Sequence, residues 1–282
     1  MKRKINELIS LNAISYFKYL PSIIFKIKNW PSFLLNYTGL QNRPITYILR
    51  NGAKIKTDRI NVGTIAVVFI KKDYGDVDDN SVVIDIGANI GVYSIFAAQS
   101  KNIIVYAYEP MPDNYNLLRE NIRLNKLDKN IFPFNLAIGA RKEKRKLYIG
   151  DSPFHSFYPI SESPFNALYG DYSQEKSQKY IEIDSMPLKE IFDKNKINQC
   201  DILKMDCEGA EFEILYNLPD EYFKKIKEIR LEYHNHFSNG VNKKNNGSYL
   251  MKFLEQKGFK VKRFKRGSDY QGDLWFEVKP QN

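Results

Sequence analysis

Two short features of the sequence combine residue types that can bind a nucleoside. The run Asp85–Gly91 reads D-I-G-A-N-I-G, with glycines at Gly87 and Gly91 and an asparagine, Asn89, between them. Glycines allow a tight turn and a close approach of backbone to a ligand, and asparagine tolerates unusual backbone angles. Glu109 follows about twenty residues later, where a carboxylate can accept hydrogen bonds from both ribose hydroxyls of an adenosine ligand. Together these residues predict a nucleoside site.

The elements around these residues are expected to position them for that task. Val82–Ile86 is a short apolar run that ends in the glycines, which is typical of a buried parallel strand. A helix is expected over 91–99, and Ile103–Tyr108 predicts a second strand with Glu109 at its end. Ligands of open α/β sheets bind beyond the carboxyl ends of the strands. The glycine turn and Glu109 should therefore meet at that edge of the sheet.

The charge of Asp85 indicates which nucleoside fits. An acid at the strand end, just before the glycines, would repel the pyrophosphate of a dinucleotide. It suits a cofactor that carries an amino group and a sulfonium. The sequence therefore predicts S-adenosylmethionine as the cofactor, with Asp85 among its binding residues.

A second polar group follows two later predicted strands. Asp206 and Glu208 stand at the end of one, and His234 and His236 follow Ile226–Tyr233. If a methyl group passes from this cofactor to an acceptor, Asp206 is expected to position or deprotonate the acceptor, with Glu208 beside it and His234 as a candidate base. Asp206 is equally suited to bind the amino acid end of the cofactor or to cap a helix. The alternative for His234 is a structural place in the core or in a surface loop.

These side chains also form a reasonable ligand set for a divalent metal ion. Some methyltransferases with this kind of fold use such an ion to acidify paired hydroxyls. Nothing in the spacing of Asp206, Glu208, His234 and His236 requires one, so no metal is predicted.

The segment 150–178 is rich in Ser, Pro, Phe and Tyr and lacks periodicity. A long irregular stretch inside a compact domain is usually a functional loop or is disordered. Its aromatic rings and hydroxyls suit a carbohydrate or lipid acceptor. We expect a lid that binds the acceptor through His155, Ser156 and Tyr158, together with His236.

Strands and helices alternate from Ser81 onward, which predicts the α/β class. The expected architecture is a doubly wound, mostly parallel seven-stranded sheet. Further helices are expected over Pro112–Asn125 and Ser248–Lys257. A closing hairpin of Phe259–Phe264 and Leu274–Val278 should place one antiparallel strand in the sheet.

Residues 1–60 are expected to form an N-terminal extension of short helices and a hairpin, ahead of a main domain over 61–282. Asn51-Gly52 predicts the turn of that hairpin. Residues 1–40 mix Lys with apolar and aromatic residues. Such a segment can lie peripherally on a membrane surface or cap its own domain, and the sequence leaves both open.

Composition sets wider bounds on the protein. The 282 residues are 43% hydrophobic, enough for a sizeable core, and the net charge is +10. That charge fits an anionic partner or simply a Lys-rich proteome. The two cysteines, Cys200 and Cys207, have no metal-like or disulfide-like spacing, which favours a reducing, cytoplasmic compartment. The oligomeric state is not predicted.

Three segments together resemble the FkbM family of methyltransferases. They are Asp85–Gly91, Glu109-Pro110 and Lys204–Glu211, which reads K-M-D-C-E-G-A-E. The resemblance covers about Ile45 to His236 and implies a class I methyltransferase, Rossmann-like fold that uses S-adenosylmethionine. Known members mostly methylate hydroxyls, often on sugars of natural products, glycans or lipids.

The resemblance also implies roles for particular residues. It implies that a carbohydrate, glycan or glycolipid hydroxyl is the acceptor. The cofactor-binding residues that it implies are Gly87, Asn89, Gly91 and Glu109, with Asn135 and Ala137 near the adenine. Met186-Pro187 departs from the Leu-Asp that the family often has before a helix, which puts the local geometry there in doubt.

Two other functions remain as alternatives. The basic charge fits a nucleic-acid methyltransferase, but carboxylates at Asp206 and Glu208 would disfavour a phosphate backbone nearby, so no nucleic acid is expected. A non-catalytic membrane-surface protein that kept the cofactor fold is the other. Salt-dependent oligonucleotide binding would favour the first, and absence of cofactor binding the second.

Overall fold

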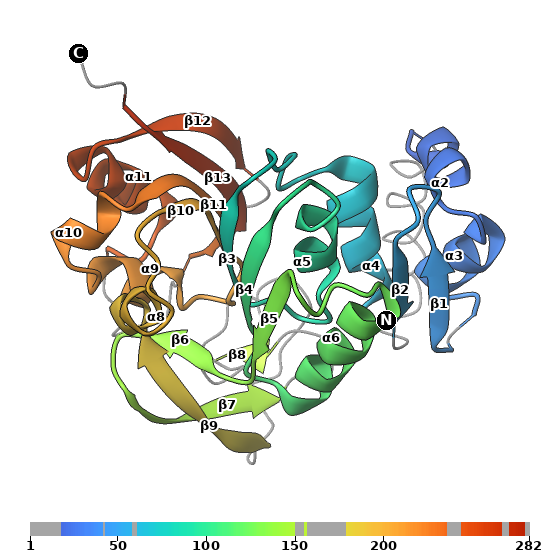
Figure 1. Cartoon of the computed structure of the whole chain (residues 1–282), viewed down its shortest axis with the longest axis horizontal. Helices are drawn as coiled ribbons and strands as arrows, with labels where there is room; N and C mark the ends of the chain where they lie inside the picture. Colours follow the sequence, from blue (N-terminus) through green and yellow to red (C-terminus); the bar gives the residue numbers. More distant parts are fainter. Residues whose placement is uncertain are drawn as a thin grey trace, which may run out of the picture.

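A seven-stranded sheet forms the centre of the molecule in the computed structural model (Figure 1). The structure describes residues 18–41, 43–57, 61–149, 155–156, 179–235, 244–266 and 271–279. The strand order is β12-β13-β11-β10-β3-β4-β5. The strands are β3 (Val82–Ile86), β4 (Ile104–Tyr108), β5 (Ile131–Phe134), β10 (Cys200–Met205), β11 (Ile226–His234), β12 (Phe259–Arg266) and β13 (Gln271–Val278).

The pairing of the strands confirms the predicted fold class. β3 pairs in parallel with β4 and β10, and β10 pairs in parallel with β11. β13 runs antiparallel to both β11 and β12, so the closing hairpin supplies the one antiparallel strand of the sheet. The strand order changes direction at β3, and the ends of β3, β4, β10 and β11 form the edge where a ligand of such a sheet binds.

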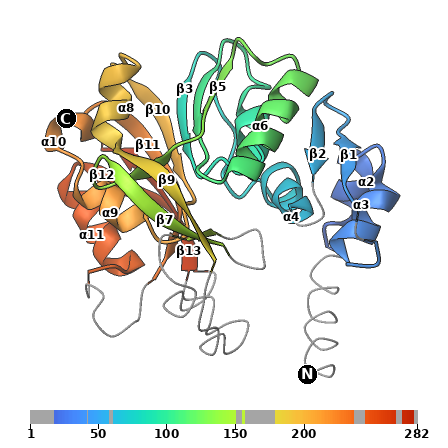
Figure 2. The same ribbon diagram turned by 90° about the horizontal axis from the view of Figure 1, so that it is seen from below.

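Helices cover both faces of the sheet, as Figure 2 shows. On β3, Val83 belongs to one hydrophobic core and its neighbour Ile84 to another, because successive side chains of a strand point to opposite faces. One face carries α5 (Val92–Ala97) and α6 (Pro112–Leu124). The other carries α8 (Leu188–Lys194), α9 (Glu211–Tyr216), α10 (Asp220–Phe223) and α11 (Gly247–Gln256).

The N-terminal extension packs against the α6 side of the sheet. Its described elements are α2 (Leu20–Lys26), α3 (Trp30–Tyr37), β1 (Ile45–Ile48) and β2 (Lys54–Thr57), and α4 (Val62–Ile65) and the π-helical η1 (Ala66–Lys71) follow it at the start of the main domain. β1 and β2 pair antiparallel, which confirms the predicted hairpin. Phe33 and Ile55 share a core with Val83, and Asn121 of α6 accepts from and donates to the backbone of Lys56. A domain boundary near residue 60 stays a prediction.

A second, four-stranded sheet was not foreseen from the sequence. It consists, in the order of pairing, of β6 (Ala137–Gly139), β9 (Tyr180–Pro187), β7 (Glu143–Ile149) and β8 (His155–Ser156). Individual strands near 146–149 and 180–183 are readable from the sequence, but their pairing joins residues far apart in the chain. The sheet begins directly after β5, and Arg145 of β7 forms an ion pair with Glu213 of α9. It therefore lies against the ligand-binding edge.

No helix among the described residues is both long enough and apolar enough to cross a membrane.

Candidate functional site

The turn between β3 and α5 fits closely against the segment that follows β10. Gly87 has a φ of 73°, and a Cβ at this position would lie 1.9 Å from the carbonyl oxygen of Asp206. Gly91 has a φ of 87°, and its Cβ would lie 2.4 Å from a side-chain carbon of Leu118. Asn89 adopts the left-handed conformation that the sequence predicts, with a φ of 50°. Both glycines are required by conformation and by space.

Asp85 is completely buried and is held by two side chains. Its Oδ2 accepts a 2.6 Å hydrogen bond from the Ser94 hydroxyl, and its Oδ1 lies 3.1 Å from Nζ of Lys204. Lys204 also donates to the carbonyl of Gly87 at 3.0 Å. Burial by itself lowers the pKa of Lys204, but the carboxylates of Asp85 and Asp206 raise it overall. Asp85 thus supports the glycine turn through Lys204, and its contact with the cofactor stays a prediction.

Glu109 follows β4 and directs its carboxylate back to the glycine turn. Its Oε2 accepts from the backbone N–H of Asn89 at 2.8 Å, and its Oε1 accepts from that of Met111 at 2.9 Å. Burial raises the pKa of Glu109 to about 7, although both N–H donors lower it. The two halves of the predicted nucleoside site are therefore joined directly.

Asn135 and Ala137 lie just beyond β5, beside the same edge. The side-chain amide of Asn135 donates to the backbone carbonyls of Glu109 and Pro110, both at 2.9 Å. Ala137 is buried at the start of β6. Asn135 thereby fixes the turn that carries Glu109, and a contact of either residue with adenine stays a prediction.

The segment after β10 is a tight loop closed by Glu211. Glu211 is fully buried, and its two oxygens accept from the backbone N–H groups of Cys207 and Gly209, each at 2.9 Å. Glu208 adopts a φ of 53°, in the left-handed region that few residues other than glycine adopt, and Gly209 follows at 102°. This loop geometry directs the Glu208 side chain toward β11.

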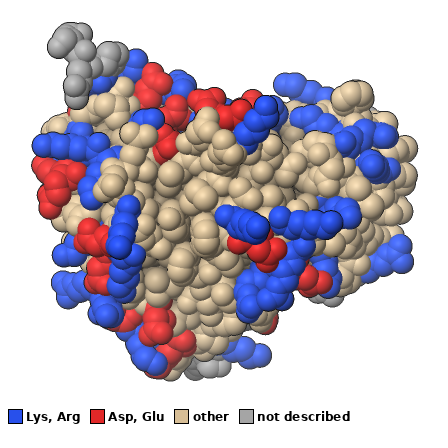
Figure 3. Space-filling view, in the orientation of Figure 1, with Lys and Arg blue, Asp and Glu red and all other residues tan. Residues whose placement is uncertain are grey.

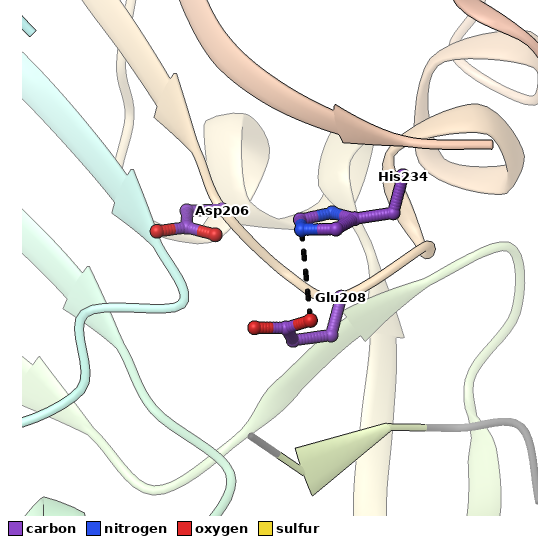
Figure 4. A group of neighbouring side chains, drawn as sticks. All are labelled: Asp206, Glu208 and His234. Atoms are coloured by element: carbon purple, nitrogen blue, oxygen red, sulfur yellow. Dashed lines mark ion pairs between the residues drawn. The ribbon is translucent and has the colours of Figure 1, made fainter. Parts of the chain in front are cut away.

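Asp206, Glu208 and His234 converge at the ends of β10 and β11 (Figure 4). One ligand atom from each lies within 4.8 Å of the others. Nε2 of His234 is 3.6 Å from Oε2 of Glu208, the ion pair drawn in Figure 4. Oδ2 of Asp206 accepts a 2.8 Å hydrogen bond from the hydroxyl of Tyr74. The structure therefore brings together the three residues that the sequence nominates for catalysis.

Three carboxylates lie close to the imidazole ring of His234. Its Nδ1 lies 3.3 Å from Glu211, and its Nε2 lies 4.0 Å from Glu232 as well as near Glu208. Burial alone lowers the pKa of His234, but these carboxylates raise it well above the ordinary value of 6.5. An imidazolium has no lone pair with which to take a proton. This environment suits a positively charged partner for carboxylates better than the base that the sequence suggests.

The same three donors are the set among the described residues that could hold a divalent ion. The ion pair between His234 and Glu208 already uses two of them, and Tyr74 donates to the third residue, Asp206. His234, Glu208 and Asp206 thus each have a contact with a protein group, and the absence of a metal ion from this site stays a prediction.

The structure describes only two of the four predicted acceptor-binding residues. His155 and Ser156 form β8, which pairs with the end of β7 in the second sheet; only their backbone is described. Tyr158 and His236 lie outside the described residues. Their contact with an acceptor remains a prediction.

Sequence reasoning missed several residues of the site. Tyr74, which binds Asp206, lies 132 positions away from it and carried no signal of its own. Lys204 and Glu211 stood inside the K-M-D-C-E-G-A-E segment, so their functional importance was readable but their partners were not. Glu232, beside His234, follows the alternation of a strand and resembles any solvent-facing acid.

Comparison with known proteins identifies the family of this chain. The model of the Methyltransferase FkbM domain matches residues 85–261, more than half of the chain. The chain belongs to the FkbM methyltransferase family. It is accordingly a methyltransferase, and S-adenosylmethionine is its cofactor. Similar proteins include methyltransferase sdnD of Sordaria araneosa, which is 24% identical over 209 residues, 63% of this chain and 80% of that protein.

Two further similarities accompany the family match. The 31-O-demethyl-FK506 methyltransferase FkbM of Streptomyces tacrolimicus is 24% identical over 169 residues, 54% of this chain and 65% of that protein. A crystal structure of M. jannaschii TYW2 in complex with AdoMet has a TM-score of 0.43 and 20% identity, and covers 85% of this chain and 88% of that one.

Proposed function

We propose that this FkbM-family enzyme methylates a hydroxyl of a carbohydrate, glycan or glycolipid acceptor. The position of Asp206 carries the proposal, because its carbonyl packs against the glycine turn while its carboxylate belongs to the polar cluster. A residue that contacts both can align an acceptor hydroxyl with the sulfonium methyl group. A relative named as a 31-O-demethyl-FK506 methyltransferase supports a hydroxyl as the acceptor group.

In the proposed reaction, the acceptor oxygen attacks the methyl carbon in line with the sulfur. The carbon–oxygen bond forms as the carbon–sulfur bond breaks, and sulfur keeps the electron pair, so S-adenosylhomocysteine leaves. The hydroxyl proton passes to Glu208, because burial raises the pKa of this carboxyl to about 8 despite the attraction of His234. A base with such a pKa can take a proton near neutral pH. Asp206 orients the hydroxyl, and His234 holds Glu208 as its cationic partner.

The nature of the acceptor is the least constrained part of the proposal. It rests on the aromatic and hydroxyl-rich segment 150–178, which contains His155, Ser156 and Tyr158, and on His236. The second sheet anchors the start of this segment beside the edge that carries Asp206. An acceptor of this kind can be linked to lipid, which is compatible with the membrane contact of residues 1–40 that the sequence leaves open.

The test is a direct assay of methyl transfer. Purified full-length protein is incubated with S-adenosylmethionine and, separately, with free oligosaccharides, lipid-linked sugars and RNA. Release of S-adenosylhomocysteine and mass spectrometry of the product identify the acceptor and the methylated atom, and Asp206→Asn is the inactive control. Methylation of sugar hydroxyls supports the proposal. Methylation of a base nitrogen in RNA, with every sugar left unmodified, would replace it with the nucleic-acid alternative.

A further inference from the structure

The residues that build one end of the molecule include basic side chains but no acidic ones. Residues 8–57 contain seven Lys or Arg and no Asp or Glu. The described part of this stretch forms α2, α3, β1 and β2, which lie together at the end opposite α10 and α11 (Figure 1). In the same orientation, Figure 3 shows mostly Lys and Arg among the charged residues on the visible face of that end. Its charge suits an anionic partner.

The same end exposes large apolar side chains. Phe25 and Leu40 are 77% and 80% exposed, the two highest values among large hydrophobic residues of the described structure. Ile24 and Leu35 are also exposed, at 37% and 41%. Leu20, Pro21, Ile24, Phe25 and Arg50 line an open groove. Single exposed apolar residues are normal, but a group that lines a groove indicates a contact surface.

The fold does not need these outward side chains, because α2 is anchored by others. Ile23 and Ile27 are buried in the core, while Ile24 and Phe25 point outward. Nζ of Lys26 donates to the backbone carbonyl of Phe69 at 2.7 Å, which fixes the helix against η1. The helix therefore presents Ile24 and Phe25 on a rigid support.

We infer that this end of the molecule docks on an anionic lipid bilayer. Phe25 and Leu40 enter the boundary between headgroups and acyl chains, and nearby exposed bases contact lipid phosphates. The exposed basic residues within 18–57 are Lys18, Lys28, Arg43, Arg50 and Lys54, and Arg50 lines the groove together with Phe25. The apolar side chains supply hydrophobic burial, and the bases select for negative charge.

Other occupants fit this surface less well. A second copy docking by the same face would bring two basic surfaces together, and like charges disfavour that contact. Single-stranded RNA would satisfy the basic residues, but it binds by stacking bases on aromatic rings. Leu40, Ile24 and Leu35 have no ring with which to stack. An anionic bilayer can bind both the exposed apolar side chains and the basic residues of this surface.

Sedimentation with vesicles tests this inference on the full-length protein. Vesicles of phosphatidylcholine alone are compared with vesicles containing about one-third phosphatidylglycerol, at low and high salt. Wild type should pellet with the anionic vesicles and be released by salt, which screens the charges. Phe25→Ser should lower the partition coefficient about tenfold or more, because one large apolar side chain no longer enters the bilayer.

Phe264→Ser is the matched control, because Phe264 is another exposed phenylalanine, 49% accessible, on β12. Its partitioning should equal that of wild type. Binding of S-adenosylmethionine, measured on the same preparations, shows that each variant is folded and separates this inference from the proposed reaction. Failure of wild type to bind anionic vesicles, equal losses in the two variants, or RNA binding that depends on Phe25 while vesicles are ignored would each overturn the inference.

Discussion

The carboxylate of Glu109 accepts a 2.8 Å hydrogen bond from the backbone N–H of Asn89. The acid at the end of β4 and the glycine turn after β3 are therefore one structural unit. Asn135 reinforces this unit from β5, since its amide binds the carbonyls of Glu109 and Pro110. The ionisation of Glu109 should consequently govern both the shape of the turn and the binding of the cofactor.

We expect the affinity for S-adenosylmethionine to fall as the pH decreases below 7. Burial raises the pKa of Glu109 to about 7, and the proposed ribose contact requires the ionised carboxylate as acceptor. Protonation competes with binding, so affinity at about one pH unit below this pKa should be about tenfold lower than at pH ~8. Isothermal titration calorimetry of S-adenosylhomocysteine binding across this range measures the effect. An affinity independent of pH would contradict the ribose role.

Glu109→Gln is the control for that experiment, and it should bind weakly with no dependence on pH. The stability of the unliganded protein provides a second readout. Folding raises the pKa from the ordinary 4.5 to about 7, so the folded state holds the proton more tightly than the unfolded chain. Ionisation of Glu109 therefore lowers the free energy of unfolding as the pH rises from about 4.5 through 7. This loss should be absent in Glu109→Gln.

The sequence predicted the central sheet because its strands carry local signals. Val82–Ile86 is a short apolar run at the position of β3, Ile226–Tyr233 mixes apolar with charged residues at the position of β11, and the closing hairpin was readable too. The sheet of β6 to β9 could not be predicted as a separate unit, since its pairing joins Ala137 to Ser185 across a segment without periodicity. The hydrophobic pattern of a strand indicates which of its side chains are buried, but it does not indicate which strand it pairs with.

The sequence indicated which residues would lie in the site, but not which of them would contact one another. Asp206, Glu208 and His234 do converge, as expected from the ends of neighbouring parallel strands. The pairing of Asp85 with Lys204 was not visible, because both look like independent strand-end residues in the sequence. The charge of His234 depends on Glu208, Glu211 and Glu232, which only the fold brings together.

Asp206→Asn should keep cofactor binding while turnover falls about 10²- to 10⁴-fold. The substitution preserves the shape of the side chain and the backbone carbonyl that packs against Gly87, but removes the charge that orients the acceptor. Tyr74→Phe should lower turnover less than Asp206→Asn does, because it removes only the 2.8 Å hydrogen bond to Oδ2 of Asp206. Single-turnover rates and cofactor affinity are measured side by side. Full turnover in Asp206→Asn would remove this residue from the catalytic machinery.

The rate of methyl transfer in wild type should rise with pH, reach half its maximum near pH ~8 and level off about one pH unit higher. This follows from Glu208 as the proton acceptor, whose carboxyl has a pKa raised by burial to about 8 and is active only when ionised. Glu208→Gln should lose both the rise and most of the rate. His234→Gln removes the cationic partner, so the rise should move to higher pH. A wild-type profile retained in Glu208→Gln would assign the proton to another group.

Gly87→Ala should destabilise the protein far more than Gly258→Ala does. Both glycines have positive φ, 73° and 94°, so both substitutions incur the conformational cost of a Cβ, about 1–2 kcal/mol. A Cβ at Gly258 meets nothing within 4 Å, whereas one at Gly87 would lie 1.9 Å from the carbonyl of Asp206. The free energy of unfolding in urea should therefore fall by several times as much in Gly87→Ala, and cofactor binding should be lost in that variant alone. Equal losses would show that backbone conformation, and not the close approach to Asp206, determines why glycine stands at this position.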